Sequence, residues 1–171
     1  MSQISSTAYK TPLPGQPRLS LHGPIVHWLA SAQQTDDQFC VLDSLLVPGV
    51  FVPLHNHPEV ECFYVLDGAL QILAYQNNEP YWLDVEAGES VVVPSSAPHA
   101  IRNTSASPVR LLMIFEARLG RFFEEVGRPV ASGGQPPLPL EEWIQVFAAA
   151  AGRYGYWLAS PEENAAIRLK P

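Results

Sequence analysis

The sequence predicts an all-β domain, an antiparallel sandwich or barrel, followed by two or three α-helices. Between residues 25 and 116, short apolar segments rich in Val, Phe, Tyr and Leu alternate with turn signals at intervals of roughly 8–12 residues, as in sandwiches and barrels. After residue 116 the apolar residues recur at helical spacing instead. The chain of 171 residues is 47% hydrophobic and has no apolar run of membrane-spanning length, which indicates one globular domain with an appendage.

Nine apolar segments are the expected strands. In chain order they are IVHWLA, FCVLDSLLV, VFVPLH, VECFYVL, ALQILAY, YWLDV, SVVVP, HAI and VRLLMIF. Asp67-Gly68, between the fourth and fifth segments, is the strongest hairpin signal because Asp-Gly suits a two-residue turn. Residues 1–24 hold four prolines and little periodicity, so they are expected to form an N-terminal arm, and residues 25–116 the barrel.

Residues 117–171 are expected to form a C-terminal helical extension. One short helix should end at Gly127, and a second should cover LEEWIQVFAAAAGRYG after a connector rich in Pro and Gly. Ser160 and Pro161 are typical of an N-cap and first-turn proline of a third helix. The residues that define the first two apolar faces are Leu119, Phe122, Phe123, Val126, Trp143, Phe147, Ala150 or Ala151, and Tyr154.

The net charge of -7 belongs entirely to the barrel and the arm before it. Residues 1–116 carry 4 basic and 11 acidic residues, and no Lys or Arg lies between Arg18 and Arg102. Binding to nucleic acid or to an anionic membrane surface needs clustered cations, so neither partner is expected. A small-molecule substrate that is not strongly anionic is expected instead, because carboxylate and phosphate sites usually use Arg or Lys.

A candidate metal site lies within this cation-free stretch. His55 and His57 are one residue apart, so in a strand both imidazoles point to the same face. Pro58 favours extended geometry at His57, and Glu61 begins the next strand. A third histidine, His99, stands on a later short strand. Three imidazoles and one carboxylate suit one divalent transition metal, Fe, Ni, Mn, Co, Cu or Zn, with positions left open for water, dioxygen or substrate.

The spacing of these residues resembles the cupin family closely. The chain matches all fixed positions of the first cupin motif, namely Gly49, His55, His57, Glu61 and Gly68. It resembles the second motif at Gly88, Pro94, His99 and Asn103, and carries Ser96 where the family usually has Gly. The resemblance implies a double-stranded β-helix (jelly-roll) barrel with His55, His57, Glu61 and His99 as metal ligands.

A single barrel followed by helices is also similar to quercetinase-like monocupins, which use a divalent metal to cleave flavonols with dioxygen. That second resemblance implies a dioxygenase, an oxidoreductase acting on a small, largely apolar or phenolic substrate. Glu61 would then be the catalytic residue, either as a lasting ligand or as acceptor of the substrate hydroxyl proton. Two alternatives stay open: a non-redox isomerase or lyase, and a metal-containing binding protein without turnover. The family analogy also implies a homodimer.

Strand alternation predicts which side chains line the cavity. Phe51, Phe63 and Ile101 are expected to point inward beside the ligands and to grip the substrate. The strand of residues 69–76 contributes either Leu70, Ile72 and Ala74 or Gln71, Leu73 and Tyr75, and its phase stays open.

Three further expectations concern single residues and location. Glu59, in the turn beside the ligands, is expected to be a solvated turn residue, and a role as a proton shuttle is the alternative. Cys40 and Cys62 lack metal-ligand spacing and are expected to be reduced thiols in the core. The first residues lack a basic region followed by an apolar one, so a cytoplasmic location is expected.

Overall fold

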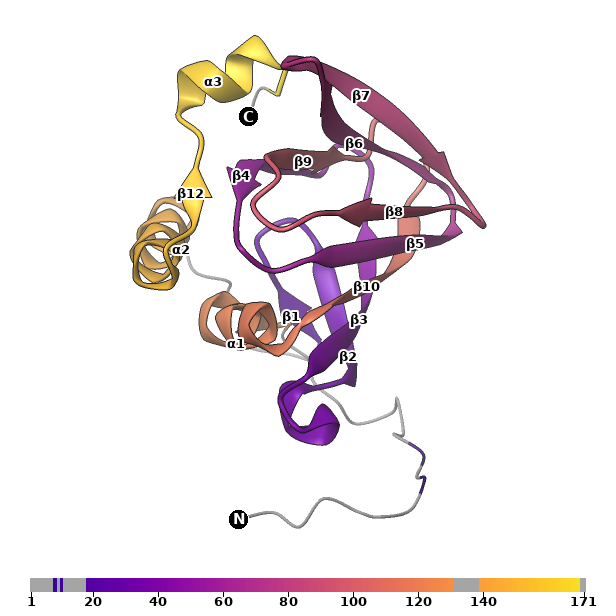
Figure 1. Ribbon diagram of the computed structural model, residues 1–171, viewed down its shortest axis with the longest axis vertical. Helices are drawn as coiled ribbons and strands as arrows, with labels where there is room; N and C mark the ends of the chain where they lie inside the picture. Colours follow the sequence, from indigo (N-terminus) through magenta and orange to yellow (C-terminus); the bar gives the residue numbers. More distant parts are fainter. Residues whose placement is uncertain (1–7, 9, 11–17, 131–138, 170–171) are drawn as a thin grey trace.

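Two antiparallel sheets face each other and enclose the main core (Figure 1). The structure, a computed structural model, describes residues 8, 10, 18–130 and 139–169. The first sheet has the order β11-β1-β2-β3-β10-β5-β8, and the second has the order β12-β4-β9-β6-β7. The strands are β1 Leu19–Ser20, β2 Ile25–Ala30, β3 Phe39–Leu46, β4 Phe51–Asn56, β5 Glu61–Asp67, β6 Ala69–Gln76, β7 Glu79–Glu86, β8 Ser90–Val93, β9 His99–Arg102, β10 Val109–Glu116, β11 Arg128–Pro129 and β12 Trp157–Leu158.

The nine predicted segments form strands β2 to β10. From β3 onward the chain crosses between the sheets: β3, β5, β8 and β10 belong to the first, and β4, β6, β7 and β9 to the second. Strands that neighbour each other in the chain are therefore often apart in the sheet. This is the jelly roll, or double-stranded β-helix, expected from the sequence motifs.

The hairpin predicted at Asp67-Gly68 is wrong. Strand β5 pairs with β10 and β8, whereas β6 pairs with β7 and β9, so Gly68 is a corner at which the chain changes sheets. Its φ of +83° lies in the left-handed region, and an added Cβ would approach the Pro108 carbonyl to 3.0 Å. The real two-residue hairpin is at Asn77-Asn78, both at positive φ, between β6 and β7.

The apolar side chains form two clusters on opposite faces of the second sheet. The interior cluster lies between the sheets and contains Phe63, Val65, Leu70, Ile72, Ile101 and Leu111, among others. The outer cluster consists of Leu54, Leu73, Ala100, Ile167 and Leu169. Leu70 and Ile72 thus point inward and Leu73 outward, which settles the phase of β6.

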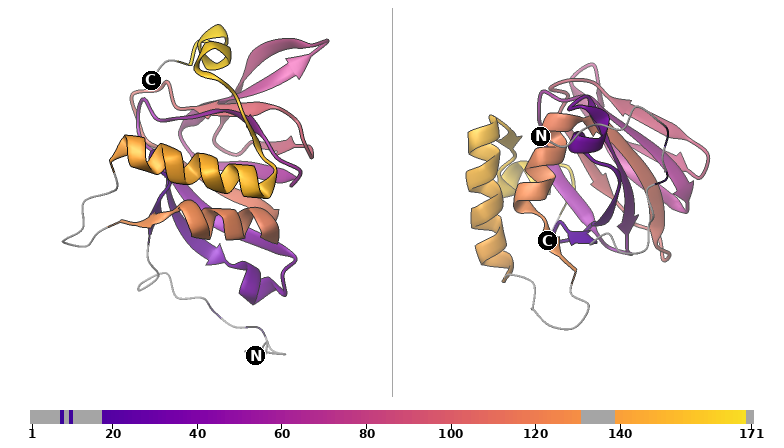
Figure 2. Two further views of the ribbon diagram at one scale, coloured as in Figure 1. Left: turned by 90° about the vertical axis from the view of Figure 1, so that its left-hand side faces the viewer. Right: turned by 90° about the horizontal axis from the view of Figure 1, so that it is seen from below.

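Three helices follow the barrel, and two of them lie side by side along one flank (Figure 2). Helix α1, Ala117–Val126, ends at Gly127 as predicted, and α2 spans Leu140–Tyr154. Phe147 and Tyr154 of α2 pack against Phe122 of α1. Helix α3, Pro161–Ala166, is capped by the Ser160 hydroxyl, which accepts the Glu163 N–H at 3.2 Å. Within the described residues, no helix combines the length and apolar character needed to cross a bilayer.

Both flanking segments add short strands to the barrel. Leu19–Ser20, within the predicted arm, forms β1 between β2 and β11, and a short 3-10 helix, η1 (Ala32–Thr35), joins β2 to β3. Trp157–Leu158, within the predicted helical extension, forms β12 and pairs with Asn56 and His55 of β4. The extension therefore reaches the strand that carries the first predicted ligand (Figure 1).

Candidate metal centre

Three strand regions bring the four predicted ligand residues together. His55 ends β4 with His57 just beyond it, Glu61 begins β5, and His99 begins β9 directly opposite His55. One ring nitrogen from each histidine lies within 4.8 Å of the others. Oε2 of Glu61 lies 3.1 Å from Nε2 of His99 and 3.3 Å from Nε2 of His57. The arrangement brings three imidazoles together, with the Glu61 carboxylate in contact with two of them.

The remaining motif residues shape the backbone around this point. Gly49, Gly68 and Gly88 have φ values of +80°, +83° and +91°, a region that disfavours other residues. Ser96 adopts φ +62° where the family usually has Gly, and its N–H donates to the His57 carbonyl at 2.8 Å. The Asn103 side chain is buried and donates to two backbone carbonyls. The Gly-to-Ser departure therefore leaves the turn in place.

The backbone fixes the orientation of two of the imidazoles. Nδ1 of His55 lies 2.7 Å from the Pro53 carbonyl, and Nδ1 of His99 lies 2.9 Å from the Ala97 carbonyl. A carbonyl can only accept a hydrogen bond, so both Nδ1 atoms carry the proton. When these imidazoles are neutral, each Nε2 is therefore unprotonated and has a free lone pair. Nε2 of His99 faces the Glu61 carboxylate.

Such a convergence of lone pairs and a carboxylate favours a cation at its centre. Burial opposes ionisation of Glu61, but its close contacts with the imidazoles of His57 and His99 outweigh it and hold the pKa of Glu61 below its usual value. Burial also lowers the pKa of His57, but its interactions with Glu61 and Glu59 raise that pKa overall. Desolvation and the neighbouring His99 lower the pKa of His55 to about 3. A carboxylate that stays ionised beside a neutral His55 is what a metal ligand set requires.

The buried imidazole of His57 provides a separate test of the fit. Its side chain is 2% exposed, and neither ring nitrogen makes a hydrogen bond of good geometry within the described residues. Buried polar atoms are normally paired, so an unpaired Nε2 aimed at this cluster points to a missing partner. A divalent transition metal bound to nitrogen and carboxylate oxygen would satisfy it.

The predicted cavity residues behave differently from one another. Phe63 and Ile101 lie on the inner face, as expected, but they are almost fully buried within the interior core. The inward orientation predicted for Phe51 is wrong: it packs against the outer cluster, and Val52 takes the inner side. A register irregularity between Val52 and His55 reverses the alternation, so counting back from His55 gives the wrong face.

Three residues near the centre were missed or misjudged by sequence reasoning. Glu59 was expected to be solvated, but its side chain is 2% exposed and lies 3.4 Å from Nδ1 of His57. Nη1 of Arg118, in α1, donates to its other oxygen at 2.5 Å. Tyr156, just before β12, places its ring 5.4 Å from that of His57. The sequence carries no signal for these contacts, because Arg118 and Tyr156 come from segments far along the chain.

In the folded protein, Arg118 therefore lies against the stretch of sequence that has no Lys or Arg of its own. The guanidinium of Arg118 is shared between Glu59 and the backbone carbonyl of Tyr154. Arg110, on β10, pairs with Asp43 at 2.6 Å and is half exposed. Both guanidinium groups are engaged by protein oxygens. Cys40 and Cys62 are free thiols; Cys40 is buried as predicted, but Cys62 is partly exposed, so its place in the core was predicted wrongly.

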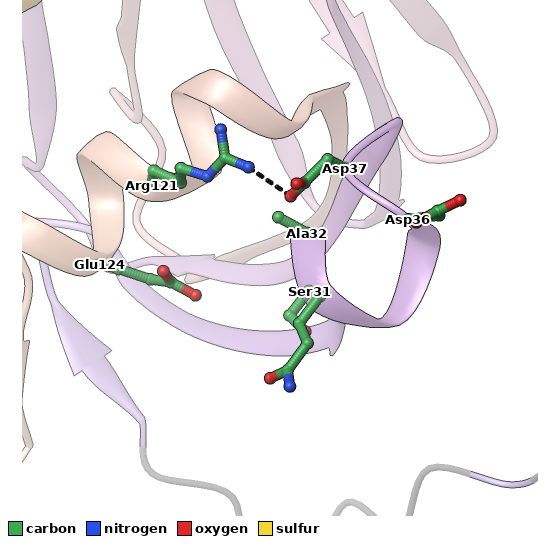
Figure 3. Close-up of a pocket in the computed structure, with 7 residues that line it drawn as sticks. Ser31, Ala32, Asp36, Asp37, Arg121 and Glu124 are labelled. Carbon is green, nitrogen blue, oxygen red and sulfur yellow. Dashed lines mark ion pairs between the residues drawn. The ribbon is translucent and has the colours of Figure 1, made fainter. Parts of the chain in front are cut away.

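A hollow of about 380 Å³ lies elsewhere, between η1 and α1 (Figure 3). It is polar and open, and the ion pair between Arg121 and Asp37 spans part of it. None of its lining residues belongs to the histidine cluster; they are Ser31, Ala32, Gln33, Asp36, Asp37, Arg121 and Glu124.

Comparisons with known proteins agree with this geometry. Residues 44–115 match the cupin domain family, and this range contains all four convergent residues. A predicted oxalate decarboxylase from Thermotoga maritima is 20% identical over 61% of this chain and 96% of its own, with a TM-score of 0.53. A sugar phosphate isomerase of the cupin superfamily from Silicibacter pomeroyi is 22% identical over 63% of this chain and 75% of its own, with a TM-score of 0.52.

A variant of oxalate decarboxylase from B. subtilis is 19% identical over 99% of this chain, with a TM-score of 0.58, and the match covers 42% of that longer protein. A search of curated protein sequences found no match. At these identities the structures bear on the fold alone. Residues 44–115, the part of the barrel that carries the histidine cluster, form a cupin domain.

Proposed function

We propose that this protein is a metal-dependent cupin enzyme, a dioxygenase acting on a small, largely apolar or phenolic substrate. The observation that carries the proposal is the cluster of His55, His57 and His99, with the Glu61 carboxylate against the last two. In the proposed holoenzyme all four residues hold one divalent transition metal. Such an ion supplies a Lewis acid for a substrate oxygen and, when it is redox-active, a partner for dioxygen.

The residues of the chain have distinct roles in this proposal. His55 and His99, each fixed through Nδ1 by a backbone carbonyl, hold their Nε2 atoms toward the ion. Glu61, with its lowered pKa, stays ionised and serves as a ligand more readily than as a proton acceptor. Phe63 and Ile101 close the barrel beneath the site and exclude water from it.

The surroundings of the centre support a substrate without strong negative charge. The guanidinium of Arg118 is already bound by Glu59 and the Tyr154 carbonyl. Trp157 and Leu158 of β12 are partly exposed beside His55 and Asn56, and add apolar surface at the barrel end that holds the site. A neutral or phenolic ring suits these apolar surroundings of the site better than a carboxylate or phosphate does.

Oxygen uptake tests the proposal. The purified chain is stripped of metal, reconstituted separately with Fe, Ni, Mn or Co, and supplied with a flavonol or a related enol in an oxygen-electrode cell. Uptake that matches substrate loss, and that disappears in His99→Ala, supports the dioxygenase.

Other outcomes separate the two alternatives. Metal-dependent conversion of a substrate without oxygen uptake would replace the dioxygenase with a non-redox isomerase or lyase. Tight metal and ligand binding without any conversion would indicate a binding protein. The homodimer and the cytoplasmic location stay predictions, and gel filtration with light scattering would check the first.

A further inference from the structure

Several unpaired buried polar atoms gather on the side of His57 that faces away from the proposed metal. They are Nδ1 of His57, Oε2 of Glu59 and the hydroxyl of Tyr156. Nδ1 of His57 lies 3.4 Å from Oε2 of Glu59, slightly beyond a good hydrogen bond. All three residues are buried. A small rotation of Glu59 would let its Oε2 accept a hydrogen bond from Nδ1 of His57.

The other side of Glu59 is fixed by the C-terminal part of the chain. Nη1 of Arg118 donates to Oε1 of Glu59 at 2.5 Å, and Nη2 donates to the Tyr154 carbonyl at 2.5 Å. The guanidinium carbon also lies 5.2 Å and 5.4 Å from the ring centres of Tyr154 and Tyr156. Burial of an ionised carboxylate is costly unless it is paired, and this pairing lets Glu59 remain buried beside His57.

The three histidines of the centre therefore differ in what orients them. Backbone carbonyls accept from Nδ1 of His55 and Nδ1 of His99. The side-chain group that faces Nδ1 of His57 is the carboxylate of Glu59. A carboxylate acceptor on the far nitrogen selects the tautomer with a free Nε2 lone pair and makes that lone pair more basic.

We propose that Glu59 is a positioning residue that orients His57 toward the metal, and that Arg118 holds Glu59 in place. Through these contacts the helical extension sets the metal affinity of the barrel. The inference rests on the proposed metal site but goes beyond it, because it assigns a role to residues outside the ligand set. Loss of an outer partner of this kind typically weakens metal binding by about 10–100-fold.

Titration with Co(II) tests this role in the full-length, metal-free chain. Calorimetry gives the dissociation constant, and the visible absorption bands of bound Co(II) report the ligand field. Glu59→Gln keeps the size of the side chain but removes its charge, so we expect binding about 10–100-fold weaker and shifted bands. A purely structural role for Glu59 would lower the melting temperature of the metal-free protein without shifting the bands.

Two variants of Arg118 and one control variant are titrated with Co(II) in the same way as Glu59→Gln. Arg118→Gln should weaken Co(II) binding less than Glu59→Gln, and Arg118→Lys should restore it because an ammonium group can also donate to the carboxylate. If Glu59→Gln does not fold, the two Arg118 variants decide whether Glu59 has the positioning role. Arg118 is half exposed, so its substitution should disturb the fold less. The matched control is Glu125→Gln, which breaks the ion pair of Glu125 with Arg153 and should leave Co(II) binding unchanged.

The outcomes are distinguishable. A wild-type chain that binds no Co(II) overturns the proposed metal site, and this inference with it. A wild-type chain that binds Co(II), while Glu59→Gln and Arg118→Gln show the same affinity and bands, overturns only the positioning role. Weaker binding and shifted bands in Glu59→Gln, with the control unchanged, support it.

Discussion

The two ends of the barrel interior are built by the same strands but differ in chemistry. Along β5, Glu61, Phe63 and Val65 all point inward, and along β9 His99 and Ile101 do. At one end of the barrel, the inward side chains of β5 and β9 are ligating groups whose polar atoms are unpaired or tightly held. Further along the same two strands, the inward side chains are apolar and are fully or almost fully buried in the interior core.

This difference shows how a packed barrel can carry a polar site. Strand pairing fixes the backbone at both ends equally, so the apolar half can stabilise the positions of the ligating half. Burial costs the polar groups free energy, and the apolar half must offset it. Substitutions at the two ends should therefore have separable effects, one on metal binding and the other on stability.

The largest expected effect is at the ligating end. His55→Ala combined with His57→Ala removes two of the four donors, so we expect the metal content to fall from one ion per chain to none. Elemental analysis of protein purified without a histidine tag measures it. His22→Ala is the control, because His22 contacts Trp143 and lies outside the cluster. Unchanged metal content in the double variant would mean that the ligand assignment is wrong.

A large effect on stability is expected at the apolar end. Phe63 is fully buried, so Phe63→Ala should lower the free energy of unfolding by about 3–5 kcal/mol through lost burial and a residual cavity. Urea denaturation of the metal-free protein measures it. The neighbouring Tyr64 is 39% exposed on the outer face, and Tyr64→Ala should cost less than about 1 kcal/mol. Similar losses in the two variants would contradict the division into an inner and an outer face.

The smallest net effect is expected for the dependence of stability on pH, because His55 and His57 act in opposite directions. The pKa of His55 falls from 6.5 to about 3 in the folded metal-free protein, so the unfolded chain binds an extra proton between these values. The free energy of unfolding should therefore decrease as pH falls from about 6.5 toward 3. The raised pKa of His57 acts in the opposite direction: the stability that it contributes is lost as pH rises through its folded value.

Comparison with His55→Gln separates the two contributions. Glutamine cannot be protonated in this range, so the variant should lose less stability between pH 6.5 and 3 than the wild-type chain does. Guanidinium denaturation of the metal-free proteins at a series of pH values measures the difference. Parallel curves for the two proteins would show that His55 has an ordinary pKa.

Local patterns were sufficient for the strands and for the first ligand candidates. Alternation and turn residues marked β2 to β10, and the spacing of His55, His57 and Glu61 marked the motif. The prediction failed where a local signal had two possible outcomes. Asp67-Gly68 suits a hairpin as well as a corner, and only the pairing of β5 with β8 and β10 decides for the corner. The register irregularity in β4 likewise turns the Phe51 side chain to the outer face of the sheet, and nothing in the sequence marks that irregularity.

By itself the sequence determined the strand segments, the helix ends and the residue types that converge, because these depend on side-chain periodicity and on residues within a few positions of each other. Only the tertiary structure decided that Glu59 is buried and reached by Arg118, that the Tyr156 ring lies against His57, and that Phe51 faces outward. These features depend on which strands pair and where the chain crosses between sheets. Contacts between segments some 60 to 100 residues apart leave no periodic trace in one sequence.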